Sequence, residues 1–284
     1  MDISTHPMRD KTALITGANT GIGLVTAMEL CRAGAHVFIA CRSAATGDEA
    51  VRAIKLAVSG AKVELLSIDL SDLVSVRRCA AEFLAKGLPL HLLVNNAGLA
   101  GAKGLTTSGF ELAFGTNHIG HFLLTQLLLE RLQSSGPARI VTVASRAHYR
   151  VAAWNWDSLT KPTQTATGLL EYSVSKLANV LFSAELARRL QGTDVTTYSL
   201  HPGVVASDVW RSVPWPIRPL IKLRMISVEE GAKTSLYCAS EPELAQVSGL
   251  YYDKCKAKLP SVLGQNKALA EELWQRSEAW TAAA

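Results

Sequence analysis

The sequence lacks the usual signs of a secreted, metal-binding or membrane-spanning protein. Its five cysteines show no C-x-x-C spacing and stand far apart, at Cys31, Cys41, Cys79, Cys238 and Cys255. Neither a disulfide framework nor a zinc site is therefore indicated. No apolar run reaches the about 18 residues of a membrane span, and the N-terminal MDISTHPMRD is short and polar. We expect a soluble, cytoplasmic protein with free thiols and no transmembrane segment.

A concentrated basic region is also missing. The formal net charge is +5, but the 29 basic and 24 acidic residues are dispersed along the chain. Because basic residues neither cluster nor alternate with aromatic ones, nucleic acid is not an expected partner. Two of the seven histidines, His118 and His121, fall on an expected helix without a third metal ligand. They indicate packing or surface roles rather than a metal site.

Short apolar runs alternate with longer helical patterns through most of the chain. Near-continuous apolar strands separated by helices are typical of a parallel sheet covered on both faces. The sequence predicts an α/β fold, a Rossmann-type doubly wound seven-stranded parallel sheet flanked by helices. No repeat or linker divides residues 1–284, so we expect one dinucleotide-binding oxidoreductase domain. The expected strands are 12–16, 35–41, 62–68, 90–95, 139–145, 195–200 and a weaker 249–253.

Two long irregular stretches, 146–168 and 202–226, interrupt this pattern. Such stretches in an α/β domain commonly carry function, and here they contain Trp154, Trp156, Trp210 and Trp215. An apolar pocket with few polar groups suits a bulky lipophilic carbonyl or alcohol, while the alternative is ordinary loop packing. The segment WPIRPLIKLRM is apolar with interspersed basic residues, so peripheral membrane contact is a third interpretation.

The first expected strand is followed directly by TGANTGIG, residues 16–23, which leads into a helical pattern. Glycines there permit a tight turn, and the N-terminus of a helix attracts a pyrophosphate. The G-x-x-x-G-x-G spacing differs from the common G-x-G-x-x-G, and the plain alternative is a turn that only joins a strand to a helix. The turn residues expected to contact a cofactor are Gly17, Asn19, Thr20, Gly21, Ile22 and Gly23.

The end of the second expected strand reads Cys41-Arg42-Ser43, where NAD-binding proteins carry an acidic residue. A guanidinium can bind a ribose 2′-phosphate through two charge-assisted hydrogen bonds, whereas a carboxylate would repel it. Arg42 therefore favours NADP(H) over NAD(H). The alternative is a solvated arginine at a strand end.

Tyr172 and Lys176 stand four residues apart in LLEYSVSKLANV, within an expected helix. This spacing puts both side chains on one helix face, where an ammonium can favour a phenolate. Tyrosine ordinarily titrates near about 10, so a nearby cation would ease proton transfer in the alcohol-oxidising direction. The spacing arises often by chance, and by itself it does not distinguish this chemistry from a simple helix-face contact.

Together with NNAG (95–98), Ser145 and HPG (201–203), these motifs resemble the short-chain dehydrogenase/reductase family over about residues 10–255. The segments ACR, TNHIGHFLLT and YSVSKLANVLF are most similar to its retinol-dehydrogenase-like branch. The resemblance implies that Asp69 and Leu70 hold the adenine, and that Asn96 and Gly98 line the adenosine side. It also implies that Val205 touches the nicotinamide amide, and it gives Tyr172 and Lys176 a part in cofactor binding.

The same resemblance implies catalytic roles for four residues. Tyr172 would transfer the proton, Lys176 would assist it and bind the nicotinamide ribose, Ser145 would orient the substrate oxygen, and Asn117 would support a water-linked proton route. Taken alone, Ser145 and Asn117 could be ordinary strand-end and helix-cap residues. Two departures are visible after HPG: Ser207 stands where relatives often have threonine near the cofactor amide, and VVASD lacks the arginine common in the retinol-dehydrogenase-like branch.

The expected activity is therefore NADP(H)-dependent interconversion of a carbonyl and an alcohol by hydride transfer. The expected substrate is a lipophilic small molecule of retinoid, steroid or aldehyde type. The alternative function is an NADP(H)-sensing regulatory protein that binds the cofactor without turnover. The resemblance also implies a homo-oligomer, a dimer or tetramer built on the helices around Asn117 and Tyr172.

Overall fold

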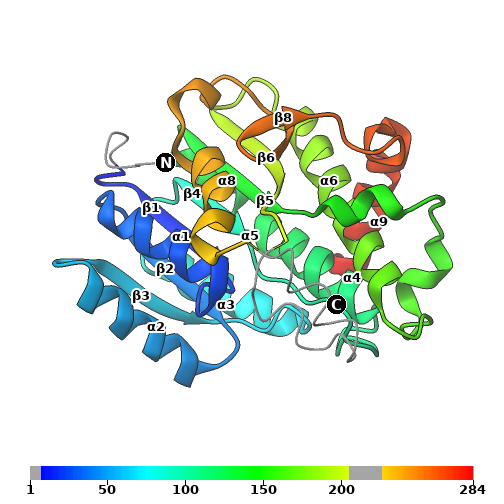
Figure 1. The fold of residues 1–284 in the computed structure, drawn as a ribbon, viewed down its shortest axis with the longest axis horizontal. Helices are drawn as coiled ribbons and strands as arrows, with labels where there is room; N and C mark the ends of the chain where they lie inside the picture. The colour runs from blue at the N-terminus through cyan, green and yellow to red at the C-terminus, as the bar shows by residue number, and fades with distance from the viewer. Residues whose placement is uncertain (1–7, 205–225, 284) are drawn as a thin grey trace.

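The computed structural model describes residues 8–204 and 226–283, which form an eight-stranded sheet between two layers of helices (Figure 1). The strand order is β3-β2-β1-β4-β5-β6-β7-β8. The strands are β1 Thr12–Thr16, β2 His36–Cys41, β3 Lys62–Ser67, β4 Leu92–Asn95, β5 Ala138–Val143, β6 Val195–His201, β7 Tyr251–Asp253 and β8 Lys256–Lys258.

The first seven strands are parallel and the eighth is not, so the predicted fold class is confirmed while the strand count is one too low. β8 pairs antiparallel with β7 through a tight connection. Its three residues, Lys-Ala-Lys, are all exposed, which explains why no apolar run marked it. Lysines on an edge strand also discourage pairing with another chain.

The two helical layers bury separate hydrophobic clusters. One face of the sheet is covered by α1 Gly21–Arg32, α2 Ala44–Ala57 and α8 Val228–Ser240. The other face is covered by α3 Leu73–Ala85, α5 Gly120–Ser134 and α6 Leu169–Arg189, with α4 Leu112–Phe114 at the start of α5. Coverage of both faces accounts for the near-continuous apolar strands.

The C-terminal helix α9, Lys267–Ala282, packs over α5 and α6 (Figure 1). Trp274 of α9 stacks on Phe182 of α6 at 5.9 Å between ring centroids and meets Phe122 of α5 edge-on at 5.0 Å. These are the two helices on which the expected oligomer would be built. The chain's own α9 therefore covers part of that surface, and the oligomer stays a prediction.

The sheet order reverses between β1 and β4, and this reversal positions the site. Ligands of doubly wound folds bind beyond the carboxyl ends of the strands at such a point. Here the turn after β1 and the NNAG loop after β4 lie next to each other, because β1 pairs directly with β4. In the described part of the chain, no helix is long and apolar enough to cross a membrane.

Candidate active site

The glycine turn after β1 has the close approaches that a dinucleotide site requires. Gly17 has a φ of +64°, and a Cβ placed there would lie 2.9 Å from Ala97 Cα. A Cβ on Gly23 would lie 2.5 Å from Asn96 Nδ2. At the N-terminus of α1, Thr20 makes no side-chain capping bond and the first turn has no acidic residue. The backbone N–H groups at the start of α1 and the dipole of this helix therefore fit a pyrophosphate.

The NNAG loop is fastened to this turn by a set of hydrogen bonds. Asn96 Nδ2 donates to the carbonyl oxygens of Thr16 (2.7 Å) and Gly17 (3.3 Å). Thr16 Oγ1 accepts the N–H groups of Asn96 and Ala97, each at 3.0 Å. The side chain of Asn96 thus holds the glycine turn. Asn19 Nδ2 donates to Thr46 Oγ1 at 2.9 Å and ties the same turn to α2.

The predicted adenosine side lies at the ends of β2 and β3. Arg42 is 70% exposed, and its Nη1 is 4.0 Å from Asp69 Oδ2. Asp69 Oδ1 accepts hydrogen bonds from Ser71 N (2.9 Å) and Ser71 Oγ (2.6 Å). Leu70 is buried in the core. The structure therefore brings Arg42 and Asp69 together, while the Leu70 side chain serves packing.

Tyr172 and Lys176 lie on the first turns of α6 and are both buried. Lys176 Nζ donates to the carbonyl oxygen of Val143, at the end of β5, at 2.8 Å. The same nitrogen is 5.8 Å from the centroid of the Tyr172 ring. A Cβ on Gly98 would lie 3.3 Å from Lys176 Nζ, so the NNAG loop also reaches this pair.

Ser145 follows β5 by two residues and caps the 3-10 helix Arg146–Arg150. Its Oγ accepts the Ala147 N–H at 3.1 Å. A hydrogen bond between Ser145 and the Tyr172 side chain opposes the effect of burial on the phenol. The structure thus brings together the predicted Ser145, Tyr172 and Lys176.

The electrostatics of the pair differ from the sequence-based expectation. Burial raises the pKa of Tyr172, and the Ser145 hydrogen bond and the Arg150 charge only partly offset it. Burial lowers the pKa of Lys176 to about 7. The expected lowering of the Tyr172 pKa by Lys176 is therefore not seen in the chain alone, because desolvation acts on both groups.

Asn117 lies in a π-helical turn, Gly115–Ile119, that joins α4 to α5. Its Oδ1 accepts the Leu99 N–H at 2.9 Å, and its Nδ2 donates to Leu99 O at 3.0 Å and Ser175 Oγ at 2.9 Å. The side chain therefore clamps the NNAG loop to α6. Single-turn π-helices within α-helices are frequent at functional sites, and no sequence period marks them.

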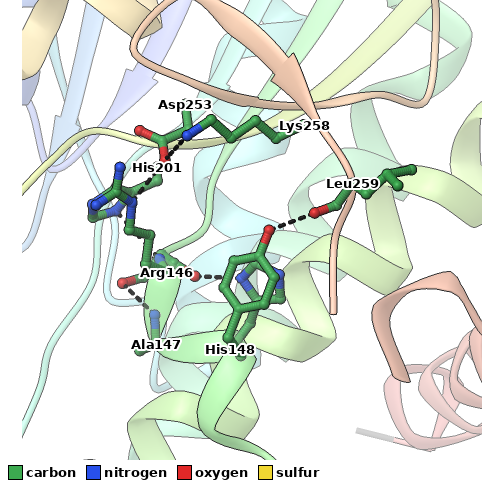
Figure 2. A network of polar contacts seen from close by, with 9 residues as sticks. Arg146, Ala147, His148, His201, Asp253, Lys258 and Leu259 are labelled. Carbon is green, nitrogen blue, oxygen red and sulfur yellow. Dashed lines mark hydrogen bonds and ion pairs between the residues drawn. The ribbon is translucent and has the colours of Figure 1, made fainter. Parts of the chain in front are cut away.

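A second polar network behind Ser145 was not predicted (Figure 2). Arg146 Nε donates to Asp253 Oδ2 at 2.7 Å, and Lys258 Nζ lies 3.3 Å from the same oxygen. The Arg146 N–H donates to His201 Nδ1 at 3.3 Å. This network joins the carboxyl ends of β5, β6 and β7. The only sequence signal was the position of these residues at strand ends.

His148 and Tyr149 extend this network to the segment after β8 (Figure 2). His148 Nδ1 lies 2.6 Å from Ser145 O, and His148 Nε2 accepts the Ser261 N–H at 3.2 Å. The Tyr149 hydroxyl donates to the carbonyl oxygen of Leu259. The segment after β8 thus supports the loop that carries Ser145.

The predicted substrate-side tryptophans divide into two groups. Trp154 and Trp156 pack edge-to-face at 5.3 Å, and the Arg276 guanidinium of α9 lies 4.4 Å from the Trp156 ring. These two join their loop to the C-terminal helix, which favours the packing interpretation. Four further predicted residues lie outside the described residues: Val205, Ser207, Trp210 and Trp215.

Comparisons with known proteins find a matching family and several similar proteins. The sequence profile of the family described as short chain dehydrogenase matches residues 11–215. Mouse retinol dehydrogenase 12 is 45% identical over 274 residues, covering 94% of this chain and 85% of its own length. Human retinol dehydrogenase 14 is 43% identical over 291 residues, covering 95% and 86%.

A solved structure resembles the whole chain. It is the crystal structure of a putative uncharacterized protein from Mycobacterium Paratuberculosis, which is 34% identical. The TM-score is 0.80, and the alignment covers 99% of this chain and 97% of that one.

Proposed function

The chain belongs to the short-chain dehydrogenase family, and from its site we propose that it interconverts a carbonyl and an alcohol with NADP(H). The observation that carries the proposal is the convergence of Ser145, Tyr172 and Lys176 beside the NNAG loop. The substrate we propose is a lipophilic aldehyde, ketone or alcohol. The similar retinol dehydrogenases are named for a lipophilic alcohol, which supports this class.

The proposed chemistry follows from what each side chain offers. When bound, the nicotinamide supplies or accepts the hydride. In reduction, Tyr172 donates its proton to the carbonyl oxygen, and Ser145 donates a hydrogen bond to that oxygen and orients it. The high pKa of Tyr172 keeps the phenol protonated and ready to donate. In oxidation, a protonated Lys176 stabilises the phenolate that receives the alcohol proton.

The cofactor preference rests on the end of β2. Arg42 is exposed, and the residue before it, Cys41, is not acidic. A 2′-phosphate at the end of β2 would therefore meet a guanidinium at the position where NAD-binding proteins carry a carboxylate. Asp69 Oδ2 lies 4.0 Å from Arg42 Nη1, and Asp69 also accepts a hydrogen bond from Ser71. The ion pair that Arg42 would give up on binding a phosphate is therefore weak.

The direct test follows NADPH and NADH absorbance with a panel of carbonyls that ranges from small to bulky and apolar. We expect oxidation of NADPH with the bulky members. Tyr172→Phe keeps the ring and removes the transferable proton, so its kcat should fall about 10²–10⁴-fold with little change in NADPH affinity. Tyr237→Phe on α8 is the matched control and should retain turnover.

Two outcomes would contradict the proposal. Tight NADPH binding without turnover of any carbonyl or alcohol would favour the alternative, a regulatory protein that senses NADP(H). A Tyr172→Phe variant with the parent's kcat would show that another group transfers the proton.

A further inference from the structure

His121, the second residue of α5, joins the two halves of the proposed site. The residue is 1% exposed. Nδ1 lies 2.9 Å from the carbonyl oxygen of Asn117, and Nε2 lies 2.8 Å from Thr16 Oγ1. One imidazole therefore connects the π-helical turn that carries Asn117 with the end of β1, where the glycine turn begins.

The contacts of Thr16 determine which nitrogen of His121 carries the proton. A hydroxyl has one donor and two acceptor positions. Both acceptor positions of Thr16 Oγ1 are filled by the N–H groups of Asn96 and Ala97. Its proton must then point to His121 Nε2 at 2.8 Å or to the more distant Val94 O at 3.4 Å. Nε2 is therefore an acceptor without a proton.

The other nitrogen faces a carbonyl oxygen, which can only accept. His121 Nδ1 must therefore carry the ring's proton and donate it to Asn117 O. A doubly protonated ring would place an Nε2–H against an oxygen with no acceptor position left. Burial lowers the pKa of His121 to about 4, which agrees with a neutral ring.

The two ends of this bridge serve different parts of the site. The Thr16 end holds the NNAG loop, which packs against the glycine turn. The Asn117 end holds the π-helical turn, and the Asn117 side chain in that turn binds Leu99 and Ser175. Ser175 Oγ in turn donates to the carbonyl oxygen of Tyr172 at 2.7 Å. His121 touches none of the proposed reacting groups.

We propose that His121, as a neutral Nδ1–H imidazole, is a positioning residue. It fixes the glycine turn and the NNAG loop relative to the π-helical turn of Asn117 and the helix that carries Tyr172. This inference rests on the proposed function, so its first measurement does not use turnover. Nitrogen-15 NMR of the full-length protein, with the His121 signal assigned by its loss in His121→Gln, reports which ring nitrogen is protonated. The Nδ1–H tautomer supports the proposal, and the Nε2–H tautomer or a charged ring near pH 7 overturns it.

A pair of substitutions separates the two ends. Asparagine places an amide near the Nδ1 position and can donate to Asn117 O, but it does not reach Thr16. Glutamine reaches Thr16 from the Nε2 position but leaves Asn117 O without its donor. We expect His121→Asn to weaken NADPH binding about tenfold and to keep most of kcat, as expected for one lost hydrogen bond. His121→Gln should lower kcat about tenfold with nearly unchanged NADPH affinity.

His118→Gln is the matched control, since His118 is one turn away on the same helical segment and equally buried. Its Nε2 lies 3.2 Å from Ser277 Oγ of α9, away from both loops. We expect it to lower the melting temperature without the split between kcat and NADPH affinity. If both His121 variants change kcat and affinity in the same proportion as His118→Gln does, His121 is only a core residue.

The outcomes of the two proposals are distinguishable. If the protein turns over no substrate, the tautomer and the NADPH dissociation constants still decide the role of His121. If the variants do not fold, the His121 signal is assigned by triple-resonance NMR of the unmodified protein, and its tautomer decides the role of His121 alone.

Discussion

The two ends of the proposed site differ in how far water reaches them. At the Tyr172 end, Lys176 is 3% exposed and Asn117 is fully buried. At the adenosine end, the Arg42 side chain is 70% exposed and that of Asp69 is 33% exposed. Electrostatic interactions are strong in a dry site and screened in a wet one. We therefore expect substitutions at the Tyr172 end to change rates by large factors, and those at the adenosine end to adjust selectivity.

The largest effect should come from Lys176→Met, which keeps the length of the side chain and removes its charge and hydrogen-bond donors. Lys176 Nζ donates to Val143 O and lies beside the Tyr172 ring. We expect kcat to fall about 10²–10⁴-fold. NADPH affinity should also weaken. Steady-state kinetics and fluorescence titration measure the two quantities.

The control for this prediction is Lys55→Met on the exposed face of α2, which should retain both kcat and NADPH affinity. A Lys176→Met variant that differs from Lys55→Met by less than about threefold in kcat would show that the buried ammonium is not needed for proton transfer.

A smaller effect should follow from Arg42→Ala at the exposed end. A charge-assisted hydrogen bond contributes about 1.5–3 kcal/mol, so the ratio of NADH to NADPH dissociation constants should fall about ten- to a hundredfold. NADPH should weaken and NADH should change little. Arg42→Ala is sharper than adding a carboxylate at Cys41, because Cys41 is buried with its Sγ close to Gly47.

Arg52→Ala, on the exposed surface of α2, is the matched control for Arg42→Ala and should leave the ratio unchanged. Both dissociation constants must be measured at one ionic strength, since exposed pairs are screened by salt. An unmodified protein that binds NADH as tightly as NADPH would refute the role given to Arg42.

The polar network around Asp253 is intermediate in exposure between the two ends of the site, because the buried carboxylate pairs with two half-exposed cations. Burial alone would raise the pKa of Asp253, but Arg146, Lys258 and His201 leave that pKa lowered. Asp253→Asn keeps the shape and removes the charge. We expect a loss of about 1–3 kcal/mol in the free energy of unfolding and a fall in kcat of no more than about tenfold.

The pH dependence of this loss has a definite sign. A carboxyl group whose pKa is lower in the folded protein stabilises it at pH values above the unfolded pKa of about 3.9. That stabilisation disappears as the pH falls through the folded pKa. The stability difference between the parent and Asp253→Asn should therefore shrink in acid. A difference that stays constant from pH 7 to pH 3 would show that packing, not the charge of Asp253, is responsible.

The sequence predicted those features of the fold and the site that have a local signal. All seven expected strands agree with the structure within about two residues at each end, because buried parallel strands are apolar throughout. Glycine motifs and Tyr-x-x-x-Lys are local, so they located the glycine turn and the Tyr172 pair. By contrast, β8 is short, exposed and basic, and no periodicity predicts it.

Features that depend on distant contacts were missed. The π-helical turn around Asn117 is held by Leu99 and Ser175, and nothing in GTNHI itself indicates it. The Arg146–Asp253 pair joins residues 107 positions apart. The pKa of Tyr172 was expected to fall because only its neighbour Lys176 could be read from the sequence. Burial, which the sequence does not measure, reverses that direction.

The last and smallest predicted effect concerns the charge of Lys176, and it tests whether the Tyr172 end is as dry as its burial indicates. With a pKa of about 7, most Lys176 side chains are neutral at pH 8. An anionic dinucleotide nearby favours the ammonium and raises that pKa, so the complex holds more protons than the free protein. NADPH binding at pH 8 should therefore take up a fraction of one proton. Calorimetry in two buffers of different ionisation enthalpy measures this uptake, and Lys176→Met should abolish it. No uptake would show that Lys176 is already charged in the free protein and that its surroundings are wetter than those of a desolvated amine. An uptake that persists in Lys176→Met would show that another group takes up the proton.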